Sequence, residues 1–366
     1  MAEEQDLSSC GVSFPLFRLP RELRDHIYHC LFTSTRLTFG ERPSSGPDTI
    51  ALIKPALNSL AILRACRQIS GEASPLWLSR VLFNFECLQC CLHKLRKLPT
   101  STLSQIRYIR VGGDPRPPPN NEQIGRVILH ARVLSGLPGL RLERLMILAP
   151  ADPAVAYEDL ERLIERSNGW RELHYITRDS EILRLPRYER FPFPVRKRMP
   201  QPSGWKDKLL KRDGLGSGAF ATVYQATELG SPGCVLDASK RQTIEQDPSG
   251  FELARSDAEA GRGFTLAGEY GKELLVVVRR GSNVDVVQRK ERRDNSGVQP
   301  VREHTGRRRP RELLRSLWKN NFYHSNSLGD QVRVVEAERY CDVDELSWEP
   351  PNSTIFRNPG TSPHIV

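Results

Sequence analysis

Residues 100–180 alternate short apolar runs with longer amphipathic stretches, and this rhythm constrains the fold more than any other feature of the chain. In chain order the runs and stretches are 106–111, 121–136, 142–148, 156–168 and 173–176. Their periods predict strand, helix, strand, helix and strand. This order favours parallel pairing with right-handed crossovers. A spacing of roughly thirty residues is also typical of a short, irregular leucine-rich-repeat solenoid. The predicted fold class is therefore mixed, α+β or α/β.

A helix is predicted ahead of this layer, over about residues 20–32. Leu19, Leu23, Ile27 and Leu31 recur at every fourth position, so they form one apolar stripe. Pro20 fits the first helical turn, where its missing N–H costs nothing.

A second amphipathic helix is predicted over residues 60–69. Gly71 and Pro75 interrupt its pattern, so a third short helix is predicted to start near residue 74. The remaining elements predicted in this part, a loop, a strand and a helix, cover 40–49, 81–86 and 88–97.

Two of these segments resemble a known family. Residues 17–32, FRLPRELRDHIYHCLF, resemble the start of an F-box, and residues 60–77, LAILRACRQISGEASPLW, resemble the second half of the fungal F-box-like variety. The positions that carry the resemblance are Leu19, Pro20, Glu22, Leu23, Ile27 and Leu31, then Leu63, Cys66, Arg67, Gln68 and Ile69. Much of the rest of the chain resembles otherwise uncharacterised fungal proteins of this type.

The F-box resemblance implies three packed helices that dock on the Skp adaptor of a cullin–RING ubiquitin ligase. The residues it implies for adaptor binding are Leu19, Pro20, Leu23, Ile27 and Leu31. One departure from the family is that about thirty residues separate the two halves, where an ordinary F-box is compact. Two interpretations follow. An adaptor role requires Leu23 and Ile27 to be exposed, whereas a capping role requires them to be buried against the β/α layer.

Residues 214–226, GLGSGAFATVYQA, match the Gly-rich loop of a protein kinase. The matching positions are Gly216, Gly218, Phe220, Val223, Tyr224 and Ala226. A kinase would continue with a Val-Ala-x-Lys strand, a His-Arg-Asp loop and an Asp-Phe-Gly motif. SPGCVLDASK follows instead, and the other two motifs are absent. A turn before a strand is the favoured interpretation.

The other candidate chemistry is weak. Cys87, Cys90, Cys91 and His93 suggest zinc, but no second ligand pair lies near them in sequence, so buried thiols in a core helix are favoured. The eight histidines are scattered, and no Gly-x-Ser-x-Gly elbow exists. A triad assembled from distant residues stays open. We therefore expect no enzyme activity, no metal and no cofactor.

The net charge of +10 comes partly from local basic runs. These are Arg196–Arg198, 289–293 and 307–311, the last of which resembles a nuclear import signal. Residues 282–312 hold few apolar side chains and no interleaved aromatic residues, so a solvated, disordered segment is favoured over direct nucleic-acid binding.

The N-terminal sequence is acidic and polar, and no apolar run approaches the length of a membrane helix, about 20 residues. We therefore expect a protein of the cytoplasm, the nucleus or both, with protein partners and no membrane. The predicted organisation is a disordered lead (1–13), an F-box-like helical segment with a loop insertion (14–86), a β/α repeat-like layer (87–185), an irregular α/β extension (186–281) and a basic, largely disordered C-terminal region (282–366).

Overall fold

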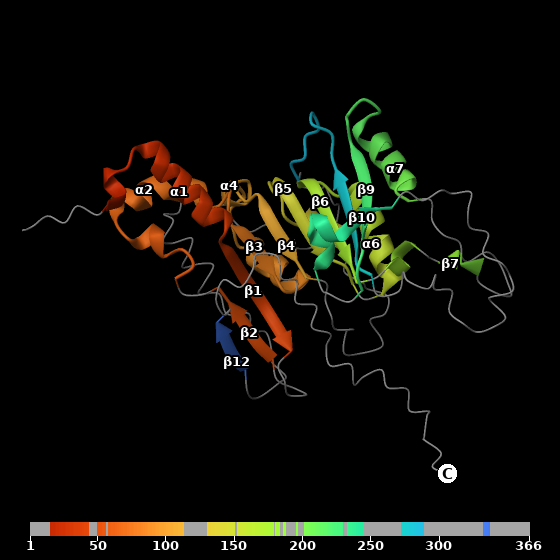
Figure 1. The fold of residues 1–366 in the computed structure, drawn as a ribbon, viewed down its shortest axis with the longest axis horizontal. Coiled ribbons are helices and arrows are strands. Elements are labelled where there is room, and N and C mark those ends of the chain that lie inside the picture. The colour runs from red at the N-terminus through yellow and green to blue at the C-terminus, as the bar shows by residue number, and fades with distance from the viewer. Residues whose placement is uncertain are drawn as a thin grey trace, which may run out of the picture.

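The computed structural model describes residues 15–43, 50–55, 58–112, 130–150, 152–178, 180–183, 186–187, 195–196, 201–229, 233–244, 272–288 and 332–336. These parts form a mixed fold of helices around one large sheet (Figure 1). The disorder predicted from residue 282 onward is wrong for 282–288, where Val286 and Gln288 are buried and the backbone bonds to Gly169 and Leu140. The rest of that segment to residue 312, with its basic runs, and the predicted disordered lead 1–13 lie outside the described residues.

The sheet has the strand order β10-β9-β11-β6-β5-β4-β3-β1-β2-β12. The strands span, in chain order, β1 Arg36–Pro43, β2 Ile50–Lys54, β3 Leu82–Phe85, β4 Tyr108–Val111, β5 Leu142–Leu148, β6 Trp170–Thr177, β9 Phe220–Ala226, β10 Arg241–Thr243, β11 Leu274–Arg279 and β12 Val332–Glu336. A separate two-stranded ladder joins β7 (Pro186–Arg187) to β8 (Val195–Arg196).

The helices are α1 Arg21–Thr33, α2 Arg67–Trp77, α3 Leu88–Leu95, α4 Thr100–Leu103, α5 His130–Ser135, α6 Pro153–Arg166 and α7 Ser203–Asp213. Short 3-10 helices are η1 Pro15–Arg18, η2 Ala61–Arg64, η4 Ser180–Leu183, η5 Cys234–Leu236 and η6 Ala238–Lys240. We call α1, α2, η1 and η2 together the head. Figure 1 places the head at one end of the sheet and α7 with β9 and β10 at the other.

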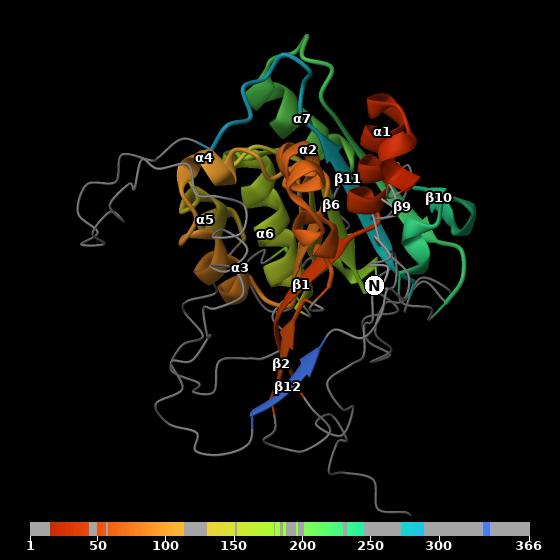
Figure 2. The same ribbon diagram turned by 90° about the vertical axis from the view of Figure 1, so that its left-hand side faces the viewer.

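The parallel β/α order predicted from periodicity is confirmed. Strands β1, β3, β4, β5 and β6 pair in parallel, each with the next. Crossovers of one hand between successive neighbours place their helices on one face of a sheet. Figure 2 accordingly shows α3, α5 and α6 together on one side, and β10 with its neighbouring loop on the other.

The end of the sheet beyond β6 is antiparallel. Strand β11 pairs with both β6 and β9, and β10 closes the edge against β9. The apolar run LLVVVR of β11 is buried at four of its six positions because it lies between two neighbouring strands. The strand predicted directly after the Gly-rich turn is confirmed as β9.

One hydrophobic core runs through the head and the helix-covered face of the sheet. Tyr28 and Phe32 of α1 belong to the same cluster as Trp170 of β6 and Trp205 of α7. A smaller cluster around Val235 lies against β6 and β11. The predicted boundary between the F-box-like segment (14–86) and the β/α layer (87–185) therefore falls inside one shared core.

The head differs from the predicted three helices. One continuous helix, α2, passes through Gly71 and Pro75, where the sequence pattern was interrupted. Ile69, Ala73 and Trp77 recur at four-residue spacing and are all buried, so packing of this face outweighs the hydrogen bond that the Pro75 nitrogen does not donate. The prediction of a helix starting near residue 74 was wrong.

The predicted loop at 40–49 is also corrected in part, because β1 extends to Pro43. The first half of β1 pairs with β3, and its second half, from Gly40, pairs with β2. Near the other terminus, β12 pairs in parallel with β2, so this short piece of the region 282–366 is a strand. None of the helices in the described parts of the chain is long and apolar enough to cross a membrane.

Candidate protein-docking surface

Helix α1 is held on α2 by a charged contact. Arg24 donates from Nε to Oε2 of Glu72 (3.0 Å) and from Nη2 to Oε1 (2.7 Å). The Tyr28 hydroxyl also donates to Glu72 Oε2 (3.0 Å), and Gln68 donates to Oε1 (3.2 Å). Because a bidentate arginine–carboxylate pair fixes both position and orientation, this contact sets the rotation of α1 about its axis.

That rotation decides which side chains of α1 face outward. Arg24, Tyr28 and Phe32 follow one another at four-residue spacing and point to α2 and the core. Leu23 and Ile27 each precede one of these residues, Arg24 and Tyr28, by one position. They form the neighbouring row of the helix, which points away from the core. Leu23 is 52% exposed and Ile27 is 39% exposed.

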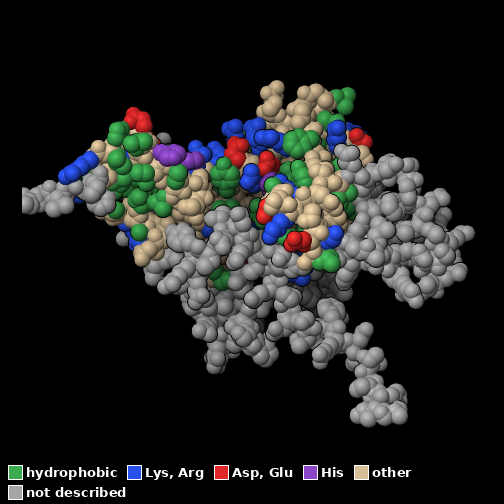
Figure 3. All heavy atoms as spheres, in the orientation of Figure 1, with side chains coloured by type: hydrophobic (Ala, Val, Ile, Leu, Met, Phe, Trp, Pro, Cys, Tyr) green, Lys and Arg blue, Asp and Glu red, His purple; other side chains and the backbone are tan. Residues whose placement is uncertain are grey.

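His26 and Cys30 are exposed beside Leu23 and Ile27, and we call these four residues the outer face of α1. They occupy positions i, i+3, i+4 and i+7 of the helix, which is one continuous stripe. Figure 3 shows hydrophobic side chains gathered over the head, with histidines next to them. An exposed apolar stripe on a rigidly held helix is suited to binding another protein.

The five residues implied for adaptor binding are separated by the structure into two groups. Pro20, Leu23 and Ile27 are exposed. Leu19 is half-buried, and Leu31 is half-buried and packs against the core. The stripe from Leu19 to Leu31 is therefore exposed only in its middle part. That part, Leu23 and Ile27, belongs to the outer face.

We expect the contact between α1 and α2 to weaken in acid. Hydrogen bonds from Arg24 are the main cause that lowers the pKa of Glu72 from 4.5 to about 2. A carboxylate whose pKa falls on folding stabilises the fold above its unfolded pKa, and this contribution is lost as the pH falls from about 4.5 to about 2. Glu72→Gln should therefore lower the thermal unfolding temperature at pH 7, and this difference should vanish at pH 2.

Glu22→Gln is the matched control for this measurement, since Glu22 is an exposed glutamate on the same helix. It should leave the unfolding temperature unchanged at both pH values. An equal loss at pH 2 and pH 7 for Glu72→Gln would show that the ionised carboxylate is not what joins the two helices.

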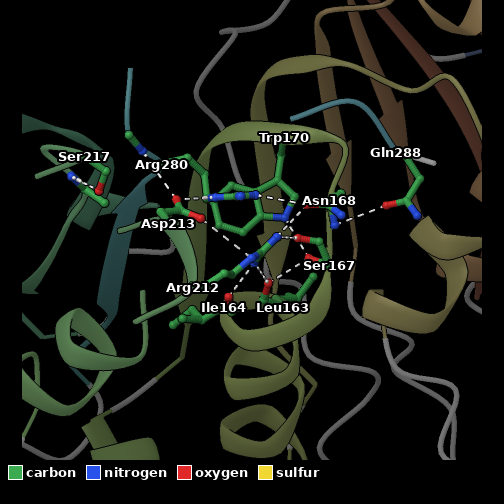
Figure 4. A network of polar contacts seen from close by, with 12 residues as sticks. Leu163, Ile164, Ser167, Asn168, Trp170, Arg212, Asp213, Ser217, Arg280 and Gln288 are labelled. Carbon is green, nitrogen blue, oxygen red and sulfur yellow. Dashed lines mark hydrogen bonds and ion pairs between the residues drawn. The ribbon is translucent and has the colours of Figure 1, made fainter. Parts of the chain in front are cut away.

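A second polar cluster lies at the opposite end of the sheet, beside the Gly-rich loop (Figure 4). Arg280 donates from Nε to Oδ2 of Asp213 (2.5 Å), and Arg212 donates from Nη2 to Oδ1 of Asn168 (2.7 Å). Arg212 also donates to the last carbonyls of α6, at Ile164 and Ser167. Burial is the main cause that lowers the pKa of Arg212 to about 10. This network ties the ends of α6, α7, β6 and β11 together.

The Gly-rich loop of residues 214–218 is a turn between α7 and β9. Gly214 (φ +100°) and Gly218 (φ +72°) have backbone angles that favour glycine. Lys240 lies beyond the other end of β9, where its carbonyl accepts from the Thr227 N–H (2.8 Å). Seven residues of strand, roughly 23 Å, thus separate that lysine from the loop. Lys240 is therefore not where a kinase places its phosphate-binding lysine.

Purified protein should accordingly show no magnesium-dependent ATP binding by isothermal titration calorimetry. Gly216→Ala should leave stability unchanged, because a Cβ there would meet no atom within 4 Å. Gly218→Ala should lower the free energy of unfolding by about 1 kcal/mol, because an L side chain is strained at positive φ. Saturable nucleotide binding that these variants remove would contradict our interpretation of the loop.

A buried histidine–aspartate pair escaped the sequence analysis. His130 Nδ1 lies 2.7 Å from Asp159 Oδ2, to which the Tyr175 hydroxyl also donates (3.2 Å). Together with Tyr175 the pair links α5, α6 and β6. His130 and Asp159 are 29 residues apart, so no local sequence motif predicts their contact. Within the described ranges His130 Nε2 has no hydrogen-bond partner, and hence no nucleophile completes a triad there.

Three cysteines lie at the N-terminal end of α3. Cys90 and Cys91 are buried, and Cys87 is the N-cap residue. His93 Nε2 lies 2.8 Å from Lys97 Nζ, on the exposed side of the helix. Among the residues that the structure describes, no three His, Cys, Asp or Glu side chains gather as metal ligands.

No protein-family model, curated protein or solved structure matches this chain.

Proposed function

We propose that this chain is a protein-interaction adaptor whose head is F-box-like and docks on the Skp adaptor of a cullin–RING ubiquitin ligase. It acts by binding and carries out no catalysis. The observation that carries the proposal is the exposure of Leu23 and Ile27, next to each other on a helix whose orientation is fixed. Of the two roles that the sequence allowed, exposure supports docking over capping.

The insertion that departs from a compact F-box has a structural account. Strands β1 and β2 lie between α1 and α2 in sequence, and β1 joins the large sheet beside β3. The insertion thus attaches the head to the sheet on the inner side of α1, where Phe32 is buried. Leu23 and Ile27 stay exposed beside the described part of the insertion, so the insertion is compatible with docking.

A substrate-recruiting subunit also needs a surface for its target. The strands β3 to β6 pair in parallel and carry helices on one face, which supports the proposal that they form a leucine-rich-repeat-like layer. We propose that this layer or the C-terminal region binds the target. The alternative function is a binding module of the same fold without ligase contact.

Leu23→Asp should abolish binding to the Skp adaptor, because it would place a charge in an apolar contact that excludes water. The chain itself should stay folded, since Leu23 contributes little to the core. Binding is measured by pull-down and calorimetry with the purified full-length chain and the purified adaptor. Circular dichroism and thermal unfolding establish that the variant is folded.

Leu229→Asp is the matched control, because Leu229 is an equally exposed leucine (61%) at the far end of the sheet. It should bind as the unchanged chain does. If Leu23→Asp unfolds the chain, Leu23 belongs to the core and docking through it is excluded. If the unchanged chain does not bind the adaptor at all, the ligase proposal fails and the alternative function stands. Point variants are preferred to deletion of residues 14–86, which would remove β1, β2 and β3 from the sheet.

A further inference from the structure

Cys87 and Cys90 form a close thiol pair at the start of α3. The chain leaves β3 at Phe85 and enters α3 two residues after Glu86, with Cys87 as the N-cap. The Cys87 sulfur accepts from the Cys90 N–H (3.3 Å), and the two sulfurs lie 2.7 Å apart. No disulfide joins the two sulfurs in the structure. A spacing of three residues across the first helical turn lets such a pair be bridged with little movement of the backbone.

The two sulfurs differ in access. Cys87 is half-buried and therefore reachable, whereas Cys90 is buried directly behind it. The N–H contact and the start of a helix both stabilise negative charge on the Cys87 sulfur. This is the division of roles in dithiol exchange, in which an accessible thiolate attacks and a covered thiol resolves. A C-x-x-C pair at a strand–helix junction is typical of that chemistry.

The neighbouring Cys91 is unsuited to either role. It is 2% exposed, and burial raises the pKa of its thiol well above the usual range. It also follows Cys90 directly, and adjacent residues of a helix do not face each other.

We propose that Cys87 and Cys90 are a reversible redox site that takes small-molecule disulfides, such as oxidised glutathione, as its oxidant. The Cys87 thiolate attacks one sulfur of the disulfide and releases one reduced thiol, which leaves a mixed disulfide on Cys87. The Cys90 sulfur then attacks Cys87, gives up its proton and releases the second reduced thiol. The pair loses two electrons and two protons, and the small disulfide gains them. This inference is independent of the proposed docking function.

The test uses the full-length chain in a Cys30→Ser background, because Cys30 is exposed and would form disulfides between molecules. The reduced protein is equilibrated in mixtures of reduced and oxidised glutathione, quenched with acid, alkylated and digested with trypsin. Cleavage after Arg80 and Lys94 releases one peptide that holds Cys87, Cys90 and Cys91 and no other cysteine. Mass spectrometry then assigns each sulfur.

As the share of oxidised glutathione rises, this peptide should gain an internal disulfide between Cys87 and Cys90, with Cys91 alone alkylated. Dithiothreitol should reverse the change completely. Cys90→Ala should trap glutathione on Cys87, and Cys87→Ala should leave Cys90 without an adduct. Cys91→Ala should keep the bridge. Alkylation of Cys91 under native conditions reports any unfolding in the same sample.

Three results would overturn the proposal. One is that all three sulfurs stay alkylated across the whole range of glutathione mixtures in the folded chain. The other is a bridge that includes Cys91, or a bridge that persists in Cys87→Ala. Zinc retained by the reduced chain and lost with Cys87→Ala would likewise assign the pair to metal binding and contradict a redox role.

Discussion

Arg280→Met should destabilise the folded chain by about 3–5 kcal/mol, because it removes the nearest cation from the buried Asp213 carboxylate and leaves only the more distant Arg212, whose Nε lies 3.8 Å from Oδ1. Both side chains of this ion pair are almost fully buried, at 3% and 0% exposed, and Arg280 Nε lies 2.5 Å from Asp213 Oδ2. Arg280 also lies over the Trp170 ring, with its guanidinium carbon 5.6 Å from the ring centroid. Equilibrium unfolding in urea, followed by tryptophan fluorescence and circular dichroism, measures the change.

Arg279→Met is the matched control one residue earlier on β11. Arg279 is 54% exposed, and its Nε lies 3.9 Å from Glu172. An exposed pair of this kind contributes about 0–1 kcal/mol. The double variant Arg280→Met with Asp213→Leu should recover much of the loss, because the buried carboxylate is removed together with its nearest cation and Arg212 keeps its carbonyl and Asn168 acceptors. Equal losses of unfolding free energy for Arg279→Met and Arg280→Met would show that the buried Arg280–Asp213 ion pair does not stabilise the fold.

The parts of the fold that the sequence predicts are those with a clear period. Strands β4, β5 and β6 carry apolar residues in short runs, and α6 shows the helical repeat with Asp152 as its N-cap. Their order alone implies parallel pairing, because right-handed crossovers leave few alternatives. Local patterns of this kind do not depend on distant residues, so they can be read without the structure.

The missed elements depend on distant partners. Only the first half of β1 alternates, with Leu37 and Phe39 buried, and the second half holds Gly40 and Pro43. That half is a strand because β2 pairs with it. Helix α2 continues past Pro75 because its buried face, ending at Trp77, is held by the core. Tertiary packing outweighs local propensity at both places.

The candidate docking surface was predicted in part for the same reason. A stripe of leucine and isoleucine at four-residue spacing shows that one side of α1 is apolar, but it does not say whether that side faces the core or a partner. The Arg24–Glu72 contact decides this, and its members are 48 residues apart. With α1 held in this rotation, Tyr28 and Phe32 face the core, and Leu23 and Ile27 are exposed at the surface.

Phe32→Ala should therefore lower the free energy of unfolding by about 3–5 kcal/mol, the usual cost of deleting a fully buried phenylalanine. Phe32 is completely buried in the cluster that joins the head to the sheet. Because the cluster is continuous, the head and sheet should lose stability together, in one cooperative transition by all probes. Urea unfolding followed in parallel by circular dichroism and tryptophan fluorescence measures both the loss and its cooperativity.

Leu23→Ala on the same helix is the matched control and should change the free energy of unfolding by about 0.5 kcal/mol or less, as is usual for exposed sites. The ratio of the two losses tests the orientation of α1 directly, without any partner protein. If α1 were instead rotated so that its Leu19–Leu31 stripe packed inward, Leu23→Ala would cost more than Phe32→Ala. That reversal would remove the outer face and, with it, the structural basis for docking. A large loss for Phe32 beside a negligible one for Leu23 would show that Leu23 can change without cost to the fold, which the proposed docking role requires.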